Sequence, residues 1–381
     1  MRAFHPDGLA RIEAWLQRDV GPRYAGSSVL LANGEGQWFA SAGERQEGVP
    51  FGRDTLVRIY SMTKPVVSLA LLQAVERGML HLDAPVSRFL SGWDAMRTVE
   101  GEACATPTLR ELALHTSGLS YGFNPGPLAP IYRSERIDFE PGGPETLGET
   151  VDRLATLPLG FASGTAWHYS VGIDVIGRVL EVVHERPLDA ILRDGILAPL
   201  GMDDTAFAVP PERADRLADC FVLDAGKRRL LDDGSASAYA EGRVRRLSGG
   251  GGLVSTIDDV ARFAAFLAGR GDARLVSPAT LRFMRCNHLG TDVGTLGTPS
   301  FAEMPMRGVG FGLGGAVVLD PGLMGVPGSA GDFAWGGMAS TYFWCDPVHG
   351  FECVFLTQLV PSSAYPQRAE LKALVHGALA D

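Results

Sequence analysis

The sequence predicts a mixed α/β (α+β) fold: an antiparallel sheet flanked by helices, with a mostly helical lobe inserted into it. Strand-like apolar runs cluster near both ends of the chain, at 28–60 and 311–358. An apolar helix pattern follows the first cluster directly. The middle of the chain, 81–239, instead carries proline, glycine and short helical patterns. Strands from the two ends are therefore expected to share one sheet.

In the amino-terminal part, apolar residues at helical spacing predict a helix over 8–20. Strand patterns separated by glycine and asparagine follow at 28–32, 37–41 and 55–60. The next helix, 62–77, is apolar nearly all round, so we expect it to be buried at the centre of the molecule.

The central segment shows short helical patterns, for example at 108–114 and 172–183. We expect residues 1–80 and 240–381 to build the α/β domain, and residues 81–239 to form the mostly helical domain. An active site is then expected in the cleft between the two domains.

The last third returns to strand patterns, at 311–320, 340–345 and 351–358. They are expected to belong to the antiparallel sheet. A closing helix is predicted over 367–379, because its leucine and valine residues fall on one face.

Composition narrows the classes of function. The chain has 381 residues, of which 46% are hydrophobic and 20% charged, which is typical of folded soluble proteins. The net charge of -10 disfavours nucleic acid and anionic membranes as partners. The amino-terminal residues lack a signal-peptide core, and the longest largely apolar run, 66–75, is too short to span a bilayer. We expect a cytoplasmic protein and leave its oligomeric state open.

The cysteines and histidines do not predict a metal centre or a bound cofactor. The cysteine number is odd, five, and no two cysteines have metal-ligand spacing. The eight histidines are scattered. Reduced thiols are the simplest interpretation, although Cys345 and Cys353 could pair across a hairpin.

Ser61 and Lys64, in the segment 60–65 (YSMTKP), are the first candidate catalytic residues. They are three residues apart at the start of a helix, so both point to the same face. The helix dipole favours negative charge at Ser61, and an apolar setting should lower the pKa of Lys64. Arginine is used almost everywhere else for cations, with only two other lysines. The alternative is an N-cap serine beside a surface lysine.

Tyr169, in the segment 167–170 (WHYS), is the second candidate. A tyrosine at a helix start, near a cationic lysine, is expected to have a lowered phenol pKa, so that it could relay a proton from Ser61. The alternative is a tyrosine that packs on Trp167 at the interface of the lobes. We interpret His168 as a structural or surface residue.

The third candidate motif is AWGGM at 334–338, on a late strand. Its glycines would let a substrate lie against the strand edge, and a backbone N–H there could complete an oxyanion hole with that of Ser61. A tight bend between strands explains the motif equally well.

In this order the three motifs resemble the serine β-lactamase and penicillin-binding-protein superfamily. The resemblance is closest to its esterase branch, the family VIII carboxylesterases, which are similar to class C β-lactamases. The stretches at 115–119 (HTSGL), 200–205 (LGMDDT) and 249–256 (GGGGLVST) support it, so that the likeness covers nearly the whole chain.

The resemblance implies roles for these residues. Ser61 would be the acylated nucleophile, with Lys64 and Tyr169 as a shared general base. The third motif would form the oxyanion and substrate-binding strand, with the N–H of Met338 as the second oxyanion donor; its residues are Trp335, Gly336, Gly337 and Met338. Tyr121, close after the HTSGL stretch, is a candidate for the pocket wall.

Two departures from the β-lactamase pattern bear on the substrate. Val171 stands where the pattern has asparagine, and Trp335 stands where it has a cation. Without that cation, a neutral, more apolar substrate is favoured over a β-lactam. We therefore expect a serine carboxylesterase for neutral, short-chain esters. The alternatives are an acyltransferase, a weak β-lactamase or D-amino-acid peptidase, and a non-catalytic binding protein.

Other motifs are rejected. The glycine pattern at 310–315 matches a dinucleotide motif, but a strand pattern follows it where a helix is required. The chain lacks the G-x-S-x-G motif of α/β-hydrolases and the His-Glu-x-x-His motif of zinc proteases.

Overall fold

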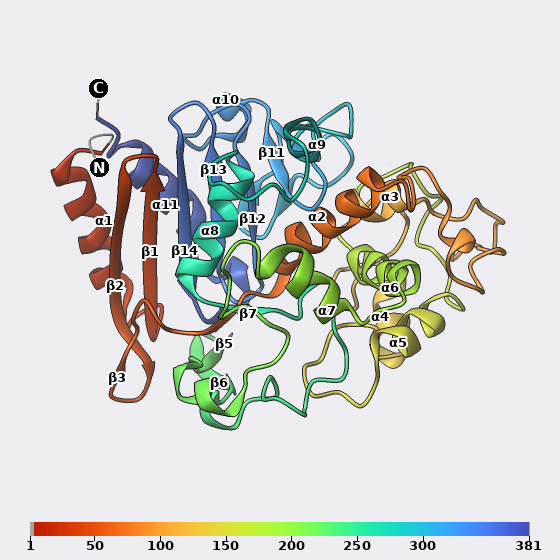
Figure 1. The fold of residues 1–381 in the computed structure, drawn as a ribbon, viewed down its shortest axis with the longest axis horizontal. Helices are drawn as coiled ribbons and strands as arrows, with labels where there is room; N and C mark the ends of the chain where they lie inside the picture. Colours follow the sequence, from red (N-terminus) through yellow and green to blue (C-terminus); the bar gives the residue numbers. More distant parts are fainter. Residues whose placement is uncertain (1–3, 381) are drawn as a thin grey trace.

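A computed structural model describes residues 4–380; the first three residues of the amino-terminal segment and position 381 lie outside the described part. An eight-stranded antiparallel sheet lies on one side of the molecule, and a group of helices lies on the other (Figure 1). The strand order is β10-β11-β12-β13-β14-β1-β2-β3. The strands are β1 Gly26–Asn33, β2 Gly36–Gln46, β3 Val49–Pro50, β10 Val309–Phe311, β11 Ala316–Val318, β12 Phe333–Gly336, β13 Tyr342–Asp346 and β14 Phe351–Thr357.

The middle of this sheet joins the two ends of the chain. Strand β1 pairs with β14, so that Val29 lies opposite Phe355. Along β1, Val29 and Leu31 face one core cluster while Leu30 faces the other, which is the period of two expected of a strand. Both faces are therefore covered, and the strand is buried along nearly its whole length.

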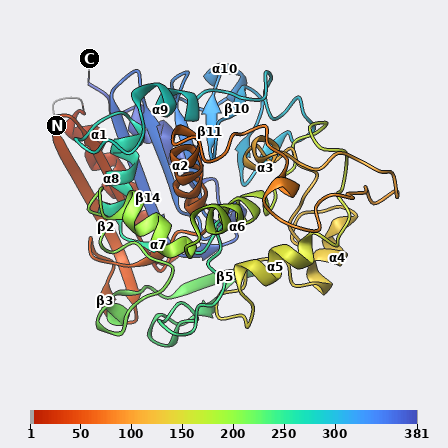
Figure 2. The same ribbon diagram turned by 45° about the vertical axis from the view of Figure 1, so that its right-hand side comes forward.

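Helices α1 (Pro6–Asp19) and α11 (Gln367–His376) pack together on one face of the sheet. Helix α8 (Ile257–Leu267) packs on the other face, against β1, β13 and β14. Helix α2 (Thr63–Glu76) is buried almost throughout and contacts α6, α7 and α9, so it connects the sheet to the helical part (Figure 2). This is the central helix that the sequence predicts.

The helical part consists of short helices with local capping. Two of them begin with a capping box, Thr108 with Glu111 and Thr146 with Glu149. The helices of this part are α3 Leu109–Ala113, α4 Leu128–Ser134, α5 Leu147–Leu154, α6 Gly172–His184 and α7 Leu188–Leu192. Two further short helices, α9 Pro278–Met284 and α10 Pro321–Met324, lie in the last third of the chain. The remaining strands are β4 Val57–Arg58, β5 Cys220–Asp224, β6 Lys227–Asp232, β7 Val254–Ser255, β8 Ser300–Phe301, β9 Met304–Pro305 and β15 Leu359–Val360. Strand β15 pairs with β5, which links the central segment to the carboxyl-terminal one.

The fold class predicted from sequence is confirmed, but two strand predictions are wrong in detail. The run 55–60 contributes only β4, which pairs with β7 outside the main sheet, because the backbone turns at Tyr60 into a short 3-10 helix. The run 311–320 is not one strand: β10 ends at Phe311 and β11 begins at Ala316. Gly314, at a φ of +91°, makes the turn between them.

Cys345 and Cys353 do not pair. Cys345 lies opposite Glu352 in the β13–β14 register, so Cys353 is one residue further along and faces the opposite side of the sheet. All five cysteines carry free thiols. Within residues 4–380, none of the helices combines the length and the apolar character needed to cross a membrane.

Candidate active site

Ser61 sits on a sharp connection between a strand and the central helix. Strand β4 ends at Arg58, and the 3-10 turn Tyr60–Met62 leads into α2 at Thr63. Tyr60 has a φ of +42°, a left-handed conformation that is strained for a tyrosine. Ser61 therefore lies at the amino-terminal end of α2, where the helix dipole favours a developing negative charge.

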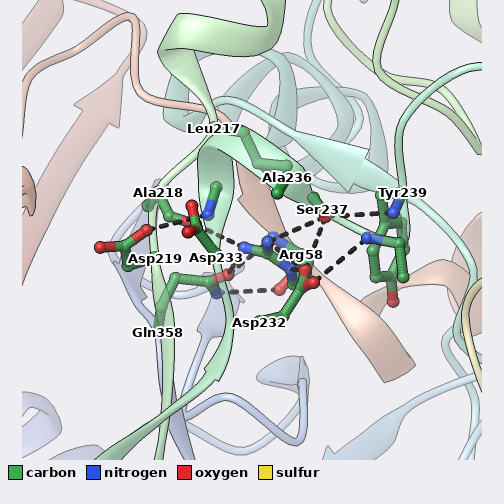
Figure 3. A network of polar contacts seen from close by, with 12 residues as sticks. Arg58, Leu217, Ala218, Asp219, Asp232, Asp233, Ala236, Ser237, Tyr239 and Gln358 are labelled. Atoms are coloured by element: carbon green, nitrogen blue, oxygen red, sulfur yellow. Dashed lines mark hydrogen bonds and ion pairs between the residues drawn. The ribbon is translucent and has the colours of Figure 1, made fainter.

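A buried arginine fixes the strand that leads to Ser61 (Figure 3). Arg58 is fully buried, and its guanidinium donates to Asp232 and to the carbonyl oxygen of Ala218. Gln358 holds its backbone on both sides, through 3.0 Å and 3.1 Å hydrogen bonds. A sixth of the Asp232 side chain is exposed, so most of the charge of this pair is removed from water. The network anchors β4 to the β5–β6 hairpin.

Lys64 points back toward Ser61 from the first turn of α2. Its Nζ lies 3.3 Å from Oγ of Ser61 and donates to the carbonyl oxygen of Gly250 at 2.6 Å. The side chain is fully buried. Burial lowers the pKa of Lys64 to about 7, against the opposite effect of the Asp174 carboxylate. This is the direction that the sequence predicts, and it leaves a large fraction of the amine neutral near pH 7.

Tyr169, just before α6, reaches Ser61 from the helical part. Its phenol donates a 2.7 Å hydrogen bond to Oγ of Ser61, and Nζ of Lys64 lies 4.6 Å from the centre of its ring. The expectation of a lowered phenol pKa is wrong. Burial raises the pKa of Tyr169 well above its usual value, and the hydrogen bond with Ser61 offsets only part of this effect. The phenol is therefore neutral at physiological pH.

Tyr121, Gly250 and Asp174 surround the buried amine of Lys64. The hydroxyl of Tyr121 lies 2.9 Å from Nζ of Lys64, and Tyr121 is not among the residues that line the neighbouring cavity. Asp174, in the first turn of α6, accepts hydrogen bonds from Oγ of Ser248 at 2.6 Å and from the N–H of Gly250 at 3.2 Å. The carboxylate thus holds the loop whose carbonyl oxygen contacts Lys64. The sequence analysis missed Asp174 and Gly250; the glycine run at 249–252 was the only signal.

The third motif lies directly beside Ser61. Strand β12 ends at Gly336, and Gly337 begins the turn to β13. A Cβ atom at Gly337 would overlap the carbonyl oxygen of Ile59, two residues before Ser61, so only glycine permits this approach. Trp335 is buried and stacks on Phe301 with ring centres 5.7 Å apart. Gly337 thus allows the β12–β13 turn to lie against the backbone that leads to Ser61.

One cavity of about 530 Å³ joins these residues. Ser61, Tyr169 and the whole Trp335–Met338 segment line it, whereas Lys64 lies behind Ser61. Its wall is largely apolar, with Met304, Met306, Val309, Val318 and Met324 among its residues. His168 contacts Oγ of Ser120 at 2.8 Å and is not among the lining residues.

The cavity also contains a cation that the sequence analysis missed. Arg368, on α11, lines the cavity and donates to the carbonyl oxygen of Gly337 at 3.1 Å. Its Nε lies 3.4 Å from a carboxylate oxygen of Glu303. Burial raises the pKa of Glu303 to about 7, while Arg368 acts in the opposite direction. No local sequence pattern relates α11 to the residues around Ser61, which explains the omission.

Comparison with known proteins assigns the family. The β-lactamase family model matches residues 12–377. The chain belongs to the β-lactamase family. The superfamily resemblance inferred from the three motifs is thereby confirmed.

Two curated relatives of this β-lactamase-family protein are named as esterases. Esterase EstB of Burkholderia gladioli is 34% identical over 329 residues, which cover 82% of this chain and 80% of EstB. Lovastatin esterase of Penicillium rubens is 32% identical over 333 residues, which cover 79% and 78% of the two chains. Among solved structures, EstCE1, described as a hydrolase with promiscuous acyltransferase activity, superposes with a TM-score of 0.82. It is 28% identical, with 97% of this chain and 99% of EstCE1 covered.

Proposed function

We propose that this protein is a serine carboxylesterase that forms an acyl-enzyme on Ser61. One observation carries the proposal: Oγ of Ser61 lies between the phenol of Tyr169, at 2.7 Å, and the amine of Lys64, at 3.3 Å, at the wall of an apolar cavity. A nucleophile, a buried base and a second proton-bearing group are the components that acyl transfer requires. The esterase relatives support the same reaction class.

In acylation, the hydrogen bonds assign separate tasks to the two neighbours of Ser61. Because the phenol of Tyr169 donates to Oγ, the hydroxyl proton of Ser61 is free to move to the neutral amine of Lys64. Oγ then attacks the ester carbonyl carbon, and the carbonyl oxygen becomes an oxyanion. We assign the N–H groups of Ser61 and Met338 to that oxyanion. As the ester C–O bond breaks, a proton from the Lys64–Tyr169 pair goes to the leaving alcohol.

In deacylation the same groups act on water. The neutral amine of Lys64 takes a proton from a water molecule, the resulting hydroxide attacks the acyl carbonyl, and Oγ of Ser61 leaves as the protonated serine. The carbonyl oxygen of Gly250 and the hydroxyl of Tyr121 hold the amine protons, so that the lone pair of Lys64 faces Oγ.

The substrate that fits this cavity is a neutral, apolar ester. Methionine, valine and aromatic side chains dominate the wall. The cation Arg368 is paired with Glu303 and bound to a backbone carbonyl, so it is not a free partner for a β-lactam carboxylate. We include in this proposal that the acyl chains are short. We also propose a cytoplasmic location, which the free thiols favour.

Acyl transfer to an alcohol is the second candidate, because EstCE1 is described as having promiscuous acyltransferase activity. It uses the same acyl-enzyme and differs only in the acceptor. Three activities have to be separated: ester hydrolysis, acyl transfer and β-lactam hydrolysis. We would measure turnover of p-nitrophenyl butyrate with and without a primary alcohol, and turnover of the cephalosporin nitrocefin. Ester hydrolysis with water as the preferred acceptor is the expected result.

The deciding experiment is intact-mass analysis after treatment with a fluorophosphonate, in which Oγ displaces fluoride from phosphorus. We expect one adduct on the wild type, none on Ser61→Ala, and one on the control Ser363→Ala, which removes another serine of the cavity wall. Ester turnover should fall by several orders of magnitude in Ser61→Ala alone. An adduct on Ser61→Ala, or more than a tenth of wild-type turnover, would refute the assignment.

A further inference from the structure

A cluster of metal-ligating side chains lies at the other end of β13 from the active-site turn. Strand β13 begins next to the turn that contains Gly337 and ends at Asp346. Nδ1 of His349 and Nε2 of His376 lie 2.9 Å and 3.2 Å from Oδ2 of Asp346, and the three ligand atoms all lie within 4.8 Å of one another. The mechanism proposed above uses none of these residues.

The two carboxylate oxygens of Asp346 have different hydrogen-bond partners. Oδ1 accepts the N–H groups of Val348 and His349, which fixes the carboxylate in the β13–β14 turn. Oδ2 accepts a 2.8 Å hydrogen bond from the hydroxyl of Ser329 and also contacts the two imidazoles. Three polar groups therefore converge on one oxygen of a carboxylate whose side chain is fully buried.

The tautomer of His376 adds an independent observation. Its Nδ1 lies 2.8 Å from the backbone carbonyl oxygen of Lys372. A carbonyl oxygen can only accept a hydrogen bond, so a neutral ring must carry its proton on Nδ1. The lone pair on Nε2 then faces Oδ2 of Asp346, and a cation or a second proton has to lie between the two acceptors. A ligating histidine typically donates its other ring N–H to a backbone carbonyl or a carboxylate in this way.

Charge and access also suit a cation. The neighbouring Asp332 is paired with Lys372 at 2.7 Å. Of the charged groups Asp332, Lys372 and Asp346, the Asp346 carboxylate therefore keeps a negative charge that Lys372 does not balance. His349 and His376 line a hollow of about 560 Å³, and 42% of the His349 side chain is exposed. An ion can therefore reach the cluster from solvent.

We propose that Asp346, His349 and His376 bind one divalent transition cation, with Zn²⁺ as the fitting example. Zn²⁺ accepts two imidazoles and a carboxylate at about 2.0–2.2 Å, which places neighbouring ligand atoms about 3.3 Å apart. The separations of 2.9 Å and 3.2 Å in the structure are close to this. Ser329 or water would complete the shell. The bound ion ties α11 to the β13–β14 turn and stabilises the carboxyl-terminal helix on the sheet.

The test is isothermal titration calorimetry of ZnCl₂ into the full chain after treatment with EDTA, together with thermal unfolding. We expect one Zn²⁺ per chain, a melting temperature that rises with Zn²⁺ concentration, and a visible spectrum of the Co²⁺ form that shows nitrogen ligands. His349→Ala and His376→Ala should each weaken binding by more than about a hundredfold, because outer-shell changes alone cost about ten- to a hundredfold.

His81→Ala removes an exposed histidine elsewhere and is the matched control. It should bind Zn²⁺ as the wild type does. The metal-free His349→Ala protein should unfold near the wild-type temperature, because its imidazole is partly exposed. Absence of saturable binding to the wild type, or equal affinity in the two site variants and the control, would overturn the proposal and leave a cluster held by hydrogen bonds alone.

Discussion

The phenol of Tyr169 donates its proton to Oγ of Ser61 across a 2.7 Å hydrogen bond, although the two residues are 108 positions apart. A phenol that donates cannot at the same time accept the proton of the serine hydroxyl. That proton is therefore available to Lys64, whose buried amine has a pKa of about 7. This geometry supports the proposal that Lys64 is the base in acylation, with Tyr169 stabilising Oγ and returning a proton.

Replacing Tyr169 with phenylalanine tests this division of roles. The ring and its packing on Trp335 stay, and only the hydroxyl is lost. We expect the acylation rate to fall by about 10²- to 10⁴-fold. The midpoint of the acidic limb of the pH profile should stay close to the wild-type value, because Lys64 sets it. Stopped-flow measurement of p-nitrophenol release checks both. An unchanged acylation rate would remove Tyr169 from the mechanism.

The pH dependence of kcat/KM should follow the neutral amine of Lys64. Burial lowers its pKa to about 7, so the active, deprotonated form dominates above that pH and is lost below it. We expect kcat/KM to fall about tenfold for each pH unit below the midpoint. Lys64→Arg should leave less than about a hundredth of the activity, because arginine cannot give up its proton. Substantial activity in Lys64→Arg would mean that a fixed charge suffices.

Asp174→Asn should move the acidic limb to lower pH. The Asp174 carboxylate raises the pKa of Lys64, so removing its charge lowers that pKa and extends activity downward. The amide keeps the size of the side chain near Ser248 and Gly250, which limits the structural change. Asp152→Asn, an exposed acid on α5, is the matched control and should leave the profile unchanged. A shift to higher pH in Asp174→Asn would contradict the electrostatic relationship.

The sequence predicted contacts between residues that are close along the chain better than contacts made by tertiary packing. Ser61 and Lys64 are one helical turn apart, so their spacing alone predicts that they share a face. Tyr169 was joined to them only through the order of the motifs and the family resemblance. Gly250 contacts Lys64 from a loop that only a glycine run marks in the sequence. Asp174 holds that loop from α6, and Arg368 reaches Gly337 from α11. Both are brought there by tertiary packing, for which the sequence carries no local signal.

The wrong expectation about the phenol of Tyr169 has a physical cause. The prediction gave weight to the helix end and to a positive charge on Lys64. Both residues are buried, and desolvation dominates: it removes much of the charge of Lys64 and raises the pKa of Tyr169. How deeply a side chain is buried is a property of the assembled fold, and composition or spacing does not supply it.

Arg58→Met should destabilise the protein strongly. The substitution removes the guanidinium and leaves the largely buried Asp232 without its partner. Breaking a buried pair in this way costs about 3–5 kcal/mol. Arg53→Met is the control, since Arg53 pairs with Asp258 at the surface, where such pairs contribute about 0–1 kcal/mol. Urea unfolding of both variants measures the difference. Equal midpoints would show that the network in Figure 3 does not anchor β4.

Gly337→Ala should impair catalysis while leaving most of the fold intact. A Cβ atom at this position meets the carbonyl oxygen of Ile59, and the N–H of Ile59 is itself bonded to the carbonyl oxygen of Leu253 at 3.1 Å. The strand before Ser61 therefore resists displacement, so the turn has to move and carries the N–H of Met338 with it. Loss of one oxyanion donor reduces kcat by about 10²- to 10³-fold.

The control for Gly337→Ala is Gly34→Ala, where a new Cβ meets no other atom within 4 Å. It should keep wild-type kcat and KM. Because Ser61, Lys64 and Tyr169 remain in Gly337→Ala, the fluorophosphonate adduct should still form, though more slowly, and thermal unfolding should show a folded protein. A variant that is folded and fully active would mean that the close approach of this turn to Ile59 does not position the oxyanion donor.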